Sequence, residues 1–155
     1  MPKKYKTEFV HDLSSPIEYA CGGQLLKAKS IQVKCPSFAQ MDDLSVLEQE
    51  FCKGQMNIVL KLSEMQSKVN MPQQAAQAEK DEDEASLGLV SSLGANGFNL
   101  PLAYQKLQLL LTSDKNPAMV DGREKITPLL FEQLSPLDAR MLLGKYLANF
   151  INFSR

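Results

Sequence analysis

Histidine and cysteine, the residues best suited to nucleophilic or metal chemistry, are scarce in this sequence. The chain holds one histidine, His11, and three cysteines, Cys21, Cys35 and Cys52. The cysteines form no C-x-x-C pair, and a single imidazole cannot complete a zinc set. We therefore expect reduced thiols in a cytosolic compartment, and no metal site. Any Ser-His or Cys-His pair would have to use His11, which falls in a predicted strand, so we interpret it as an exposed or hydrogen-bonded histidine.

Carboxylates are the remaining candidates for chemistry. Asp42 and Asp43 are adjacent, so on a helix they point in different directions and do not form a general acid–base pair. The acidic segment EKDEDE at residues 79–84 lacks the glycine and the terminal glutamate of a calcium loop. The sequence also contains neither G-x-G-x-x-G nor a P-loop. We expect no enzyme activity and no cofactor, although carboxylates brought together by folding would leave no local pattern.

The charge balance gives no general reason to bind a polyanion. Lys and Arg number 17 against 18 Asp and Glu, a formal net charge of −1, so we expect no nucleic-acid and no membrane partner. The start, MPKKYKTEF, lacks the apolar region of a signal peptide, and Pro2 excludes N-myristoylation. Because no run of about 18 apolar residues exists, no membrane span is expected. A chain of this length is interpreted as a single domain, residues 1–155.

The pattern of apolar residues predicts an α+β fold, in which an N-terminal antiparallel β-hairpin packs on a mostly helical domain. The hairpin unit covers residues 5–36, and its turn is CGGQ at residues 21–24, whose glycines tolerate positive φ. In the returning strand, Ile31 shares a face with Leu25, and we expect this face to be buried. The opposite, mostly polar face is expected to hold Ala28, Ser30, Gln32 and Lys34. A lone hairpin is too small to be stable and needs helices to cover it.

The remainder divides into three predicted parts: residues 37–69 are helical, 70–86 form an acidic flexible linker, and 87–155 are helical again. Ser37 is the expected N-cap of the first helix, and Gly54 is expected to break or bend it. The dense like charges of the linker repel each other, and few apolar residues offset the entropy of ordering. Asp121-Gly122 is expected to turn a small hairpin inside the last part.

Two helices are predicted at residues 127–153, each opening on a hydroxyl–proline pair, Thr127-Pro128 and Ser135-Pro136. Asp138 follows Ser135 by three residues, where a carboxylate can accept hydrogen bonds from the free N–H groups at the start of the helix and is favoured by the helix dipole. Apolar residues cover far more than one stripe of the second helix, so it must bury two sides. An ordinary core is the simpler explanation of this width, but our functional interpretation depends on the other one, in which a second polypeptide covers the apolar area that the fold leaves open.

Short motifs at the two ends of the chain occur in an order found in a known family. The first end reads L-x-x-P-I-E-Y from Leu13, then a Gly-Gly hairpin, a returning strand, and P-S-F-A-Q-M-D-D-L entering a helix at Pro36. The other end has a short helix with Leu134, then Ser135, Leu137, Asp138 and a helix closing in Asn149-Phe150. This order resembles the tail assembly chaperones of long-tailed bacteriophages. The likeness covers about half the chain, and Lys34-Cys35-Pro36 stands where many members have R-E-P.

The resemblance implies a non-enzymatic protein of the host cytoplasm, without a cofactor, that holds the phage tape-measure protein soluble and recruits tail-tube protein. Methionine-containing apolar faces suit such a role because methionine adapts to variable partners, although it also fills ordinary cores. We predict the partner face in the groove between the helix of residues 137–151 and that of residues 56–69. Its predicted residues are Met56, Val59, Leu62, Met65, Met141, Leu143, Leu147, Phe150 and Ile151.

Two other classes of function remain open. A structural virion component of the tail or baseplate would use the same apolar helices as permanent interfaces. A small enzyme with spatially assembled carboxylates is the third class, and a deep polar pocket would favour it. The sequence also leaves open whether the chain forms homo-oligomers.

Overall fold

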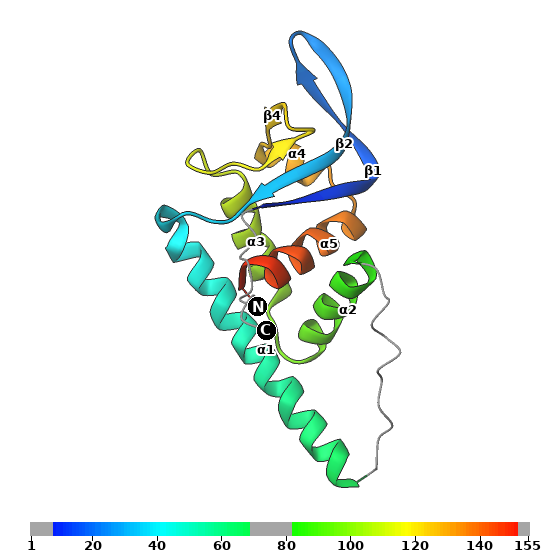
Figure 1. The fold of residues 1–155 in the computed structure, drawn as a ribbon, viewed down its shortest axis with the longest axis vertical. Helices are drawn as coiled ribbons and strands as arrows, with labels where there is room; N and C mark the ends of the chain where they lie inside the picture. Colours follow the sequence, from blue (N-terminus) through cyan, green and yellow to red (C-terminus); the bar gives the residue numbers. More distant parts are fainter. Residues whose placement is uncertain (1–7, 69–81, 152–155) are drawn as a thin grey trace, which may run out of the picture.

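A four-stranded antiparallel sheet unites the N-terminal hairpin with a second, much shorter one (Figure 1). The computed structural model describes residues 8–68 and 82–151, and for residues 61–68 only the course of the helix. Its strands lie in the order β1 (Glu8–Cys21), β2 (Gln24–Lys34), β3 (Met119–Val120) and β4 (Glu124–Lys125). With the helices described below, this is the predicted α+β fold with its N-terminal hairpin.

An irregularity in the long hairpin changes which side chains of β2 are buried. Asp12 pairs with Ser30 and Ile17 pairs with Ala28, so the four residues 13–16 of β1 lie opposite the single residue Lys29 of β2. Because side chains alternate along a strand, the buried positions change parity at such a bulge. Ile31 is buried on one side of it and Ala28 on the other. The prediction that Ala28 faces solvent and Leu25 the core is therefore wrong, and Leu25 is 67% exposed.

The second hairpin follows the prediction made from Asp121-Gly122. Asp121 and Gly122 adopt φ angles of 52° and 70°, which a tight two-residue connection requires. Strand β3 pairs with β2, with Val120 opposite Ile31. The docking of this hairpin onto the edge of the first one was not predicted, because two-residue strands carry too little pattern.

Helix α1 (Met41–Lys68) follows a short 3₁₀ turn, η1 (Phe38–Gln40), at the predicted start after Ser37. It runs unbroken through Gly54, so the predicted break there is wrong. A Cβ on Gly54 would lie 2.7 Å from Cδ2 of Leu93, which shows that the glycine permits close approach of another helix. The first half of α1 lies along the body of the molecule, and its second half projects beyond it (Figure 1).

Helix α2 (Glu82–Ala95) begins inside the segment predicted as a linker. Residues 82–86 are therefore helical, which corrects the predicted boundary at 86, while residues 70–81 lie outside the described residues. The α2 helix is held by packing of Val90 and Leu93, which are 2% and 0% exposed. Most of the stability of a helix in a protein comes from such packing, so the acidic residues at the start of α2 adopt helical structure despite their mutual repulsion.

The remaining helices begin after capping side chains, two of which, Thr127 and Ser135, were predicted. Helix α3 (Leu100–Leu111) starts after Asn99, whose side chain accepts a hydrogen bond from the Leu102 N–H. Helix α4 (Pro128–Glu132) starts after Thr127, whose hydroxyl accepts a hydrogen bond from the Leu130 N–H. Helix α5 (Pro136–Tyr146) starts after Ser135, whose hydroxyl accepts a hydrogen bond from the Asp138 N–H. A π-helical turn, η3 (Leu147–Ile151), closes the described chain.

Helix α5 lies in the middle of the molecule, with the sheet on one side and α2 on the other (Figure 1). The core gathers around it and includes residues of the sheet, of α1, of α2 and of α3. Its largest fully buried apolar side chains are Tyr146, Ile31, Leu47, Leu93, Leu107, Leu110, Ile126, Leu142, Leu143, Leu147 and Val33.

Candidate partner-binding surface

The predicted partner residues of the C-terminal helix are internal. Met141, Leu143, Leu147 and Phe150 are 8%, 0%, 0% and 4% exposed, and Ile151 is half-buried against the core. Helix α1 packs mainly on α3 and α2, whereas α5 packs on α2, β1 and α3. These residues of α5 and η3 therefore offer no exposed surface in the predicted groove, and they are core residues rather than partner contacts.

The second side of α5 is covered by the protein's own helix α2. At Gly144 the two helices approach so closely that a Cβ would lie 2.5 Å from the Ser86 carbonyl oxygen. On the sheet side, the Phe150 ring lies 5.5 Å from that of Phe9 and 5.0 Å from that of Tyr146, centroid to centroid. The sequence correctly indicated two buried sides for this helix, but the expectation that a second polypeptide covers one of them is wrong, because α2 of the same chain covers it.

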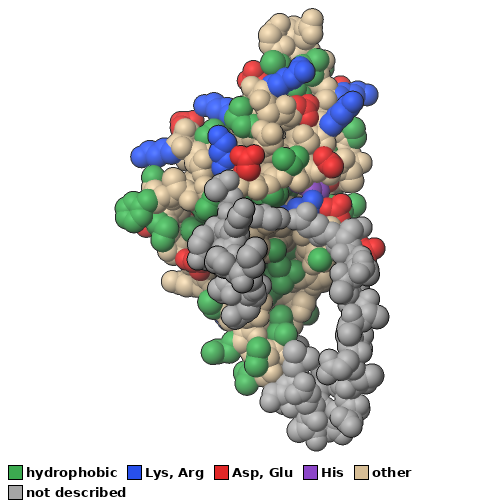
Figure 2. Space-filling model, in the orientation of Figure 1, with side chains coloured by type: hydrophobic (Ala, Val, Ile, Leu, Met, Phe, Trp, Pro, Cys, Tyr) green, Lys and Arg blue, Asp and Glu red, His purple; other side chains and the backbone are tan. Residues whose placement is uncertain are grey.

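Helix α1 retains an exposed apolar surface, which we call the α1 face: Met56, Val59 and Leu60. These side chains are 68%, 59% and 59% exposed. They are spaced i, i+3 and i+4, so they lie on one side of the helix. Figure 2 shows hydrophobic side chains at the lower end of the described surface, over the projecting half of α1. The side chains of the other two predicted residues, Leu62 and Met65, lie outside the described residues.

A chain of buried polar side chains runs through the core and was not predicted. His11 is 0% exposed; its Nε2 lies 3.0 Å from Oδ1 of Asp138 and its Nδ1 2.9 Å from Nζ of Lys145. Lys145 Nζ also lies 2.6 Å from Oδ1 of Asp83, at the start of α2. Because a lysine ammonium only donates, Nδ1 of His11 accepts and Nε2–H donates to Asp138. Both ring nitrogens are thereby occupied, so the hydrogen-bonded interpretation of His11 holds.

Asp138 was predicted to interact with the start of its own helix, but its carboxylate also stabilises the bulge of β1. Its carboxylate accepts the backbone N–H groups of Ser14 at 2.9 Å and Ser15 at 3.2 Å, and the Ser135 hydroxyl at 3.0 Å. Burial alone would raise the pKa of Asp138, but the hydrogen bonds from Ser14, His11, Ser15 and Ser135 together hold that pKa below its ordinary value. The network links β1, α5 and α2 and leaves the ionised carboxylate fully partnered.

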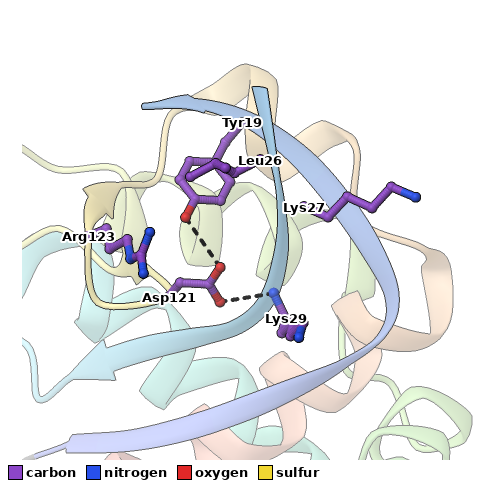
Figure 3. Close-up of a pocket in the computed structure, with 6 residues that line it drawn as sticks. All are labelled: Tyr19, Leu26, Lys27, Lys29, Asp121 and Arg123. Atoms are coloured by element: carbon purple, nitrogen blue, oxygen red, sulfur yellow. Dashed lines mark hydrogen bonds between the residues drawn. The ribbon is translucent and has the colours of Figure 1, made fainter. Parts of the chain in front are cut away.

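A basic cleft of about 330 Å³ lies between the two hairpins (Figure 3). Its lining residues are Tyr19, Leu26, Lys27, Lys29, Asp121 and Arg123. Asp121 accepts from the backbone N–H groups of Lys29 and Ser30, both at 2.9 Å, and from the Tyr19 hydroxyl at 3.3 Å. Burial opposes the ionised form, but these bonds hold the pKa of Asp121 below its ordinary value. The carboxylate thus fastens the short hairpin to β2.

The described residues offer little else of catalytic character. No group of three or more His, Cys, Asp or Glu side chains suited to a metal ion occurs among them. The three cysteines are free, Cys21 half-buried and Cys35 and Cys52 exposed. None of the helices in this part of the chain combines the length and the apolar character needed to cross a bilayer.

The fold and surface thus define a small α+β protein with one projecting helix that carries exposed apolar side chains. Comparison with known proteins finds no matching family model, no matching curated protein and no matching solved structure.

Proposed function

We propose that this protein is a tail assembly chaperone of a long-tailed bacteriophage, which acts in the host cytoplasm and binds the tape-measure protein through the α1 face. The observation that carries the proposal is the exposure of Met56, Val59 and Leu60 on a helix that projects from the body (Figure 1). The resemblance at the two ends of the sequence supports the choice of family. Recruitment of tail-tube protein belongs to the same proposal.

The α1 face suits reversible docking of a second helix. Apolar side chains spaced i, i+3 and i+4 are the contacts that an amphipathic helix presents to a partner. Covering one large apolar side chain contributes about 1.5–3 kcal/mol, so three such contacts give useful affinity without permanent association. Met56 adds adaptability because its side chain is unbranched and polarizable. A holding protein needs both properties, since its partner must later leave it.

The flanking side chains give this surface a polar edge. Lys53 and Glu50 form an ion pair at 3.2 Å one turn before Met56, and Lys53 is half-exposed. Glu50 is only 16% exposed and also accepts a hydrogen bond from the Asn99 N–H at 2.9 Å, so it belongs to the contact of α1 with the start of α3. Lys53 is the charged side chain that borders the apolar residues on the solvent side.

Co-purification of the tape-measure protein tests the proposal. We expect Met56→Glu combined with Val59→Glu to abolish co-purification while the variant keeps the wild-type circular dichroism spectrum. The matched control is Leu25→Glu combined with Leu129→Glu, two residues 67% and 73% exposed elsewhere on the surface. Equal loss in both double variants, or no loss in either, would contradict a specific role of the α1 face.

A structural virion component is the alternative class, and it differs in where the protein ends up. A chaperone acts on the tape-measure protein before the tail is complete and should be absent from purified particles. Quantitative mass spectrometry of purified virions separates the two. Stoichiometric copies in mature particles would replace the chaperone proposal with a structural one.

A further inference from the structure

Strand β2 has an unpaired edge beside the basic cleft. The short hairpin pairs with β2 only at Ile31 and Gln32, so residues 24–28 have no neighbouring strand on that side in the part of the chain that the structure describes. In Figure 1 this end of the long hairpin extends past the short one. Such an edge presents backbone N–H and C=O groups that a strand of another polypeptide can pair with.

The turn of the long hairpin determines which groups of β2 face this edge. Both glycines of the turn have positive φ, as a two-residue hairpin turn requires, and Cys21 pairs with Gln24 across them. The residues that flank such a turn form a hydrogen-bonded pair, and hydrogen-bonded and open pairs then alternate along the ladder. Leu25 and Lys27 belong to open pairs, so their N–H and C=O groups point away from β1.

Two hydrogen bonds at the edges of the hairpin agree with this alternation. Lys29, the next outward residue after Lys27, donates its N–H to Oδ1 of Asp121 at 2.9 Å. Glu18, which lies opposite Lys27 on β1, donates its N–H to Oε1 of Gln133 at 3.4 Å. The outward N–H groups of Lys29 and Glu18 thus have acceptors, whereas Lys27 has no acceptor for its N–H among the described residues.

The cleft at this edge combines positive charge with an apolar wall. Lys27 and Lys29 line it from one face of β2 and Leu26 from the other, because neighbouring side chains alternate along a strand. Arg123 lines it from the short hairpin, and Figure 3 shows Asp121 between that arginine and the two lysines. The three basic side chains are exposed. Asp121 is the one acidic residue among those that line the cleft, so positive charge prevails there.

These features together determine which kind of ligand fits. The free edge offers both N–H donors and C=O acceptors, whereas an ionised phosphate group only accepts, so a polypeptide backbone matches the edge better. The side chains of an added strand alternate between two faces, so acidic ones can reach Lys27 and Lys29 while apolar ones contact Leu26. The volume of about 330 Å³ is at the small end of ligand pockets, which suits a short extended segment. The acidic residues 82–84 of this chain are helical, so they are not that segment.

We propose that the edge of β2 at Leu25 and Lys27 binds a short acidic segment of another polypeptide as an added β-strand. The backbone of that segment pairs with the outward N–H and C=O groups, its carboxylates contact the three basic side chains of the cleft, and its apolar side chains contact Leu26. The edge lies at the end of the molecule opposite the projecting half of α1 (Figure 1). The proposal therefore does not depend on the α1 face or on the phage assignment.

Fluorescence anisotropy with labelled, end-blocked peptides tests the proposal. The probe alternates aspartate with valine, and a comparison peptide has asparagine in place of every aspartate. Since hydrogen bonds to charged groups are the strong ones, we expect the asparagine peptide to bind more weakly by about tenfold or more. Equal binding of the two peptides would contradict recognition of an acidic segment.

Two N-methylated probes test whether the peptide binds as a strand. One carries methyl groups on the aspartate nitrogens, and the other carries them on the valine nitrogens. Along a strand the N–H groups of alternate residues point to opposite edges, so only one of these two sets faces β2. We expect one methylated probe to bind more weakly by about tenfold or more and the other to keep the affinity of the parent. Equal effects of the two methylations, whether none or the same loss, would overturn strand addition.

Variants of the protein assign the charged contacts. Lys27→Gln combined with Lys29→Gln should raise the Kd of the probe about tenfold. The matched control is Lys34→Gln combined with Lys115→Gln, which removes the same charge from two exposed lysines outside the cleft and should leave the Kd unchanged. Thermal melting followed by circular dichroism shows whether each variant is folded. Equal Kd values for the two folded double variants would contradict the assigned contacts.

A proline variant tests the backbone contact. Lys27→Pro removes the outward N–H, and because that N–H does not pair with β1, an edge strand tolerates proline there. This variant should bind the probe about tenfold more weakly than Lys27→Gln, which removes only the charge. A folded Lys27→Pro variant with the same Kd as Lys27→Gln would contradict pairing at this edge.

Two further arms separate the proposal from a plain anion site and from the α1 face. Tripolyphosphate carries negative charge but no N–H donors and should compete only weakly; competition as strong as that of the unlabelled peptide would overturn strand addition in favour of an anion site. The variant Met56→Glu with Val59→Glu should bind the probe normally even though it is expected to lose the tape-measure protein. Loss of probe binding in that variant would contradict two separate sites.

Discussion

Helices α5 and α1 are both rich in apolar residues, yet the protein uses them in opposite ways. Most apolar side chains of α5 and of η3 are enclosed by β1, α2 and α3, with Leu143 and Leu147 at 0% exposed, while Leu137 at the start of α5 is 43% exposed. In the second half of α1, Met56, Val59 and Leu60 stay open, at 68%, 59% and 59% exposed. A wide apolar surface therefore indicates that a helix is covered on two sides, but not which chain covers it. The covered helix holds the fold, and the open one is the surface available to a partner.

The difference arises from one close approach in the core. Gly144 lets α2 lie against α5, and the contact with Ser86 leaves no room for a side chain. The ion pair of Lys145 with Asp83 fastens the start of α2 beside it. Along the second half of α1, by contrast, Val59 and Leu60 meet no covering element among the described residues, and only Ile58 is packed against the core.

The largest effect is expected from shortening a side chain of the enclosed helix. Leu147→Ala should lower the free energy of unfolding by about 2–5 kcal/mol, because it leaves a cavity in a close-packed core. Urea denaturation followed by circular dichroism measures the loss. The comparison variant Met56→Ala should stay within about 0.5 kcal/mol of wild type. Similar losses for the two would remove the distinction between the helices.

Removing the carboxylate of Asp138 should be the next most costly change. Asp138→Asn leaves at least one of the backbone N–H groups of the β1 bulge poorly partnered, at a cost of about 1–3 kcal/mol at neutral pH. Since the folded-state pKa of Asp138 lies below the unfolded value of about 3.9, its contribution is present above that value and is lost as pH falls through the folded pKa. The cost of the substitution should therefore shrink in acid, and a pH-independent cost would contradict the hydrogen-bonded carboxylate.

Two glycines test which close approaches matter. Gly144→Ala forces a Cβ against the Ser86 backbone and should cost about 1–3 kcal/mol despite the better helix propensity of alanine. In Gly54→Ala the one close contact, at 2.7 Å, is with the end of the Leu93 side chain, while Cβ of Phe98 and of Leu93 lie at ordinary contact distances of 3.6 and 3.7 Å. The gain in propensity of about 1 kcal/mol should therefore offset most of the clash. Chemical denaturation of both variants measures the difference. A larger loss at Gly54 than at Gly144 would contradict the role assigned to the contact between α2 and α5.

The smallest effect on stability is expected on the α1 face itself. Val59→Glu exchanges an exposed apolar side chain for a charged one on a helix and should change the free energy of unfolding by no more than about 0.5 kcal/mol. Its effect should appear in partner binding instead. A cooperative loss of several kcal/mol would show that Val59 contributes to the core.

Much of the fold could be predicted because its signals are local. The Gly22-Gly23 turn, the caps at Thr127 and Ser135, and the Asp121-Gly122 turn each depend on a few neighbouring residues. The contacts that decide burial are not local. Ser86 and Gly144 meet only after folding, and so do His11 and Asp138, 127 positions apart in the sequence.

For the same reason, only part of the predicted partner face remains. Met56 and Val59 are exposed, as a partner face requires, because no other described element lies over them. Leu143 and Leu147 are not, because a helix distant in sequence covers them. The identity of that covering helix was hidden by its composition: α2 starts with a run of acidic residues that, taken alone, is typical of a linker.

Hydrogen–deuterium exchange of the protein, alone and with the tape-measure protein, tests the central claim most directly. In the free protein the amides of α5 should already be strongly protected, and those of the projecting half of α1 only weakly. Binding should slow exchange around Met56–Leu60 and leave α5 and α2 unchanged. New protection in α5, with none in α1, would show that the partner enters the core and would contradict this account.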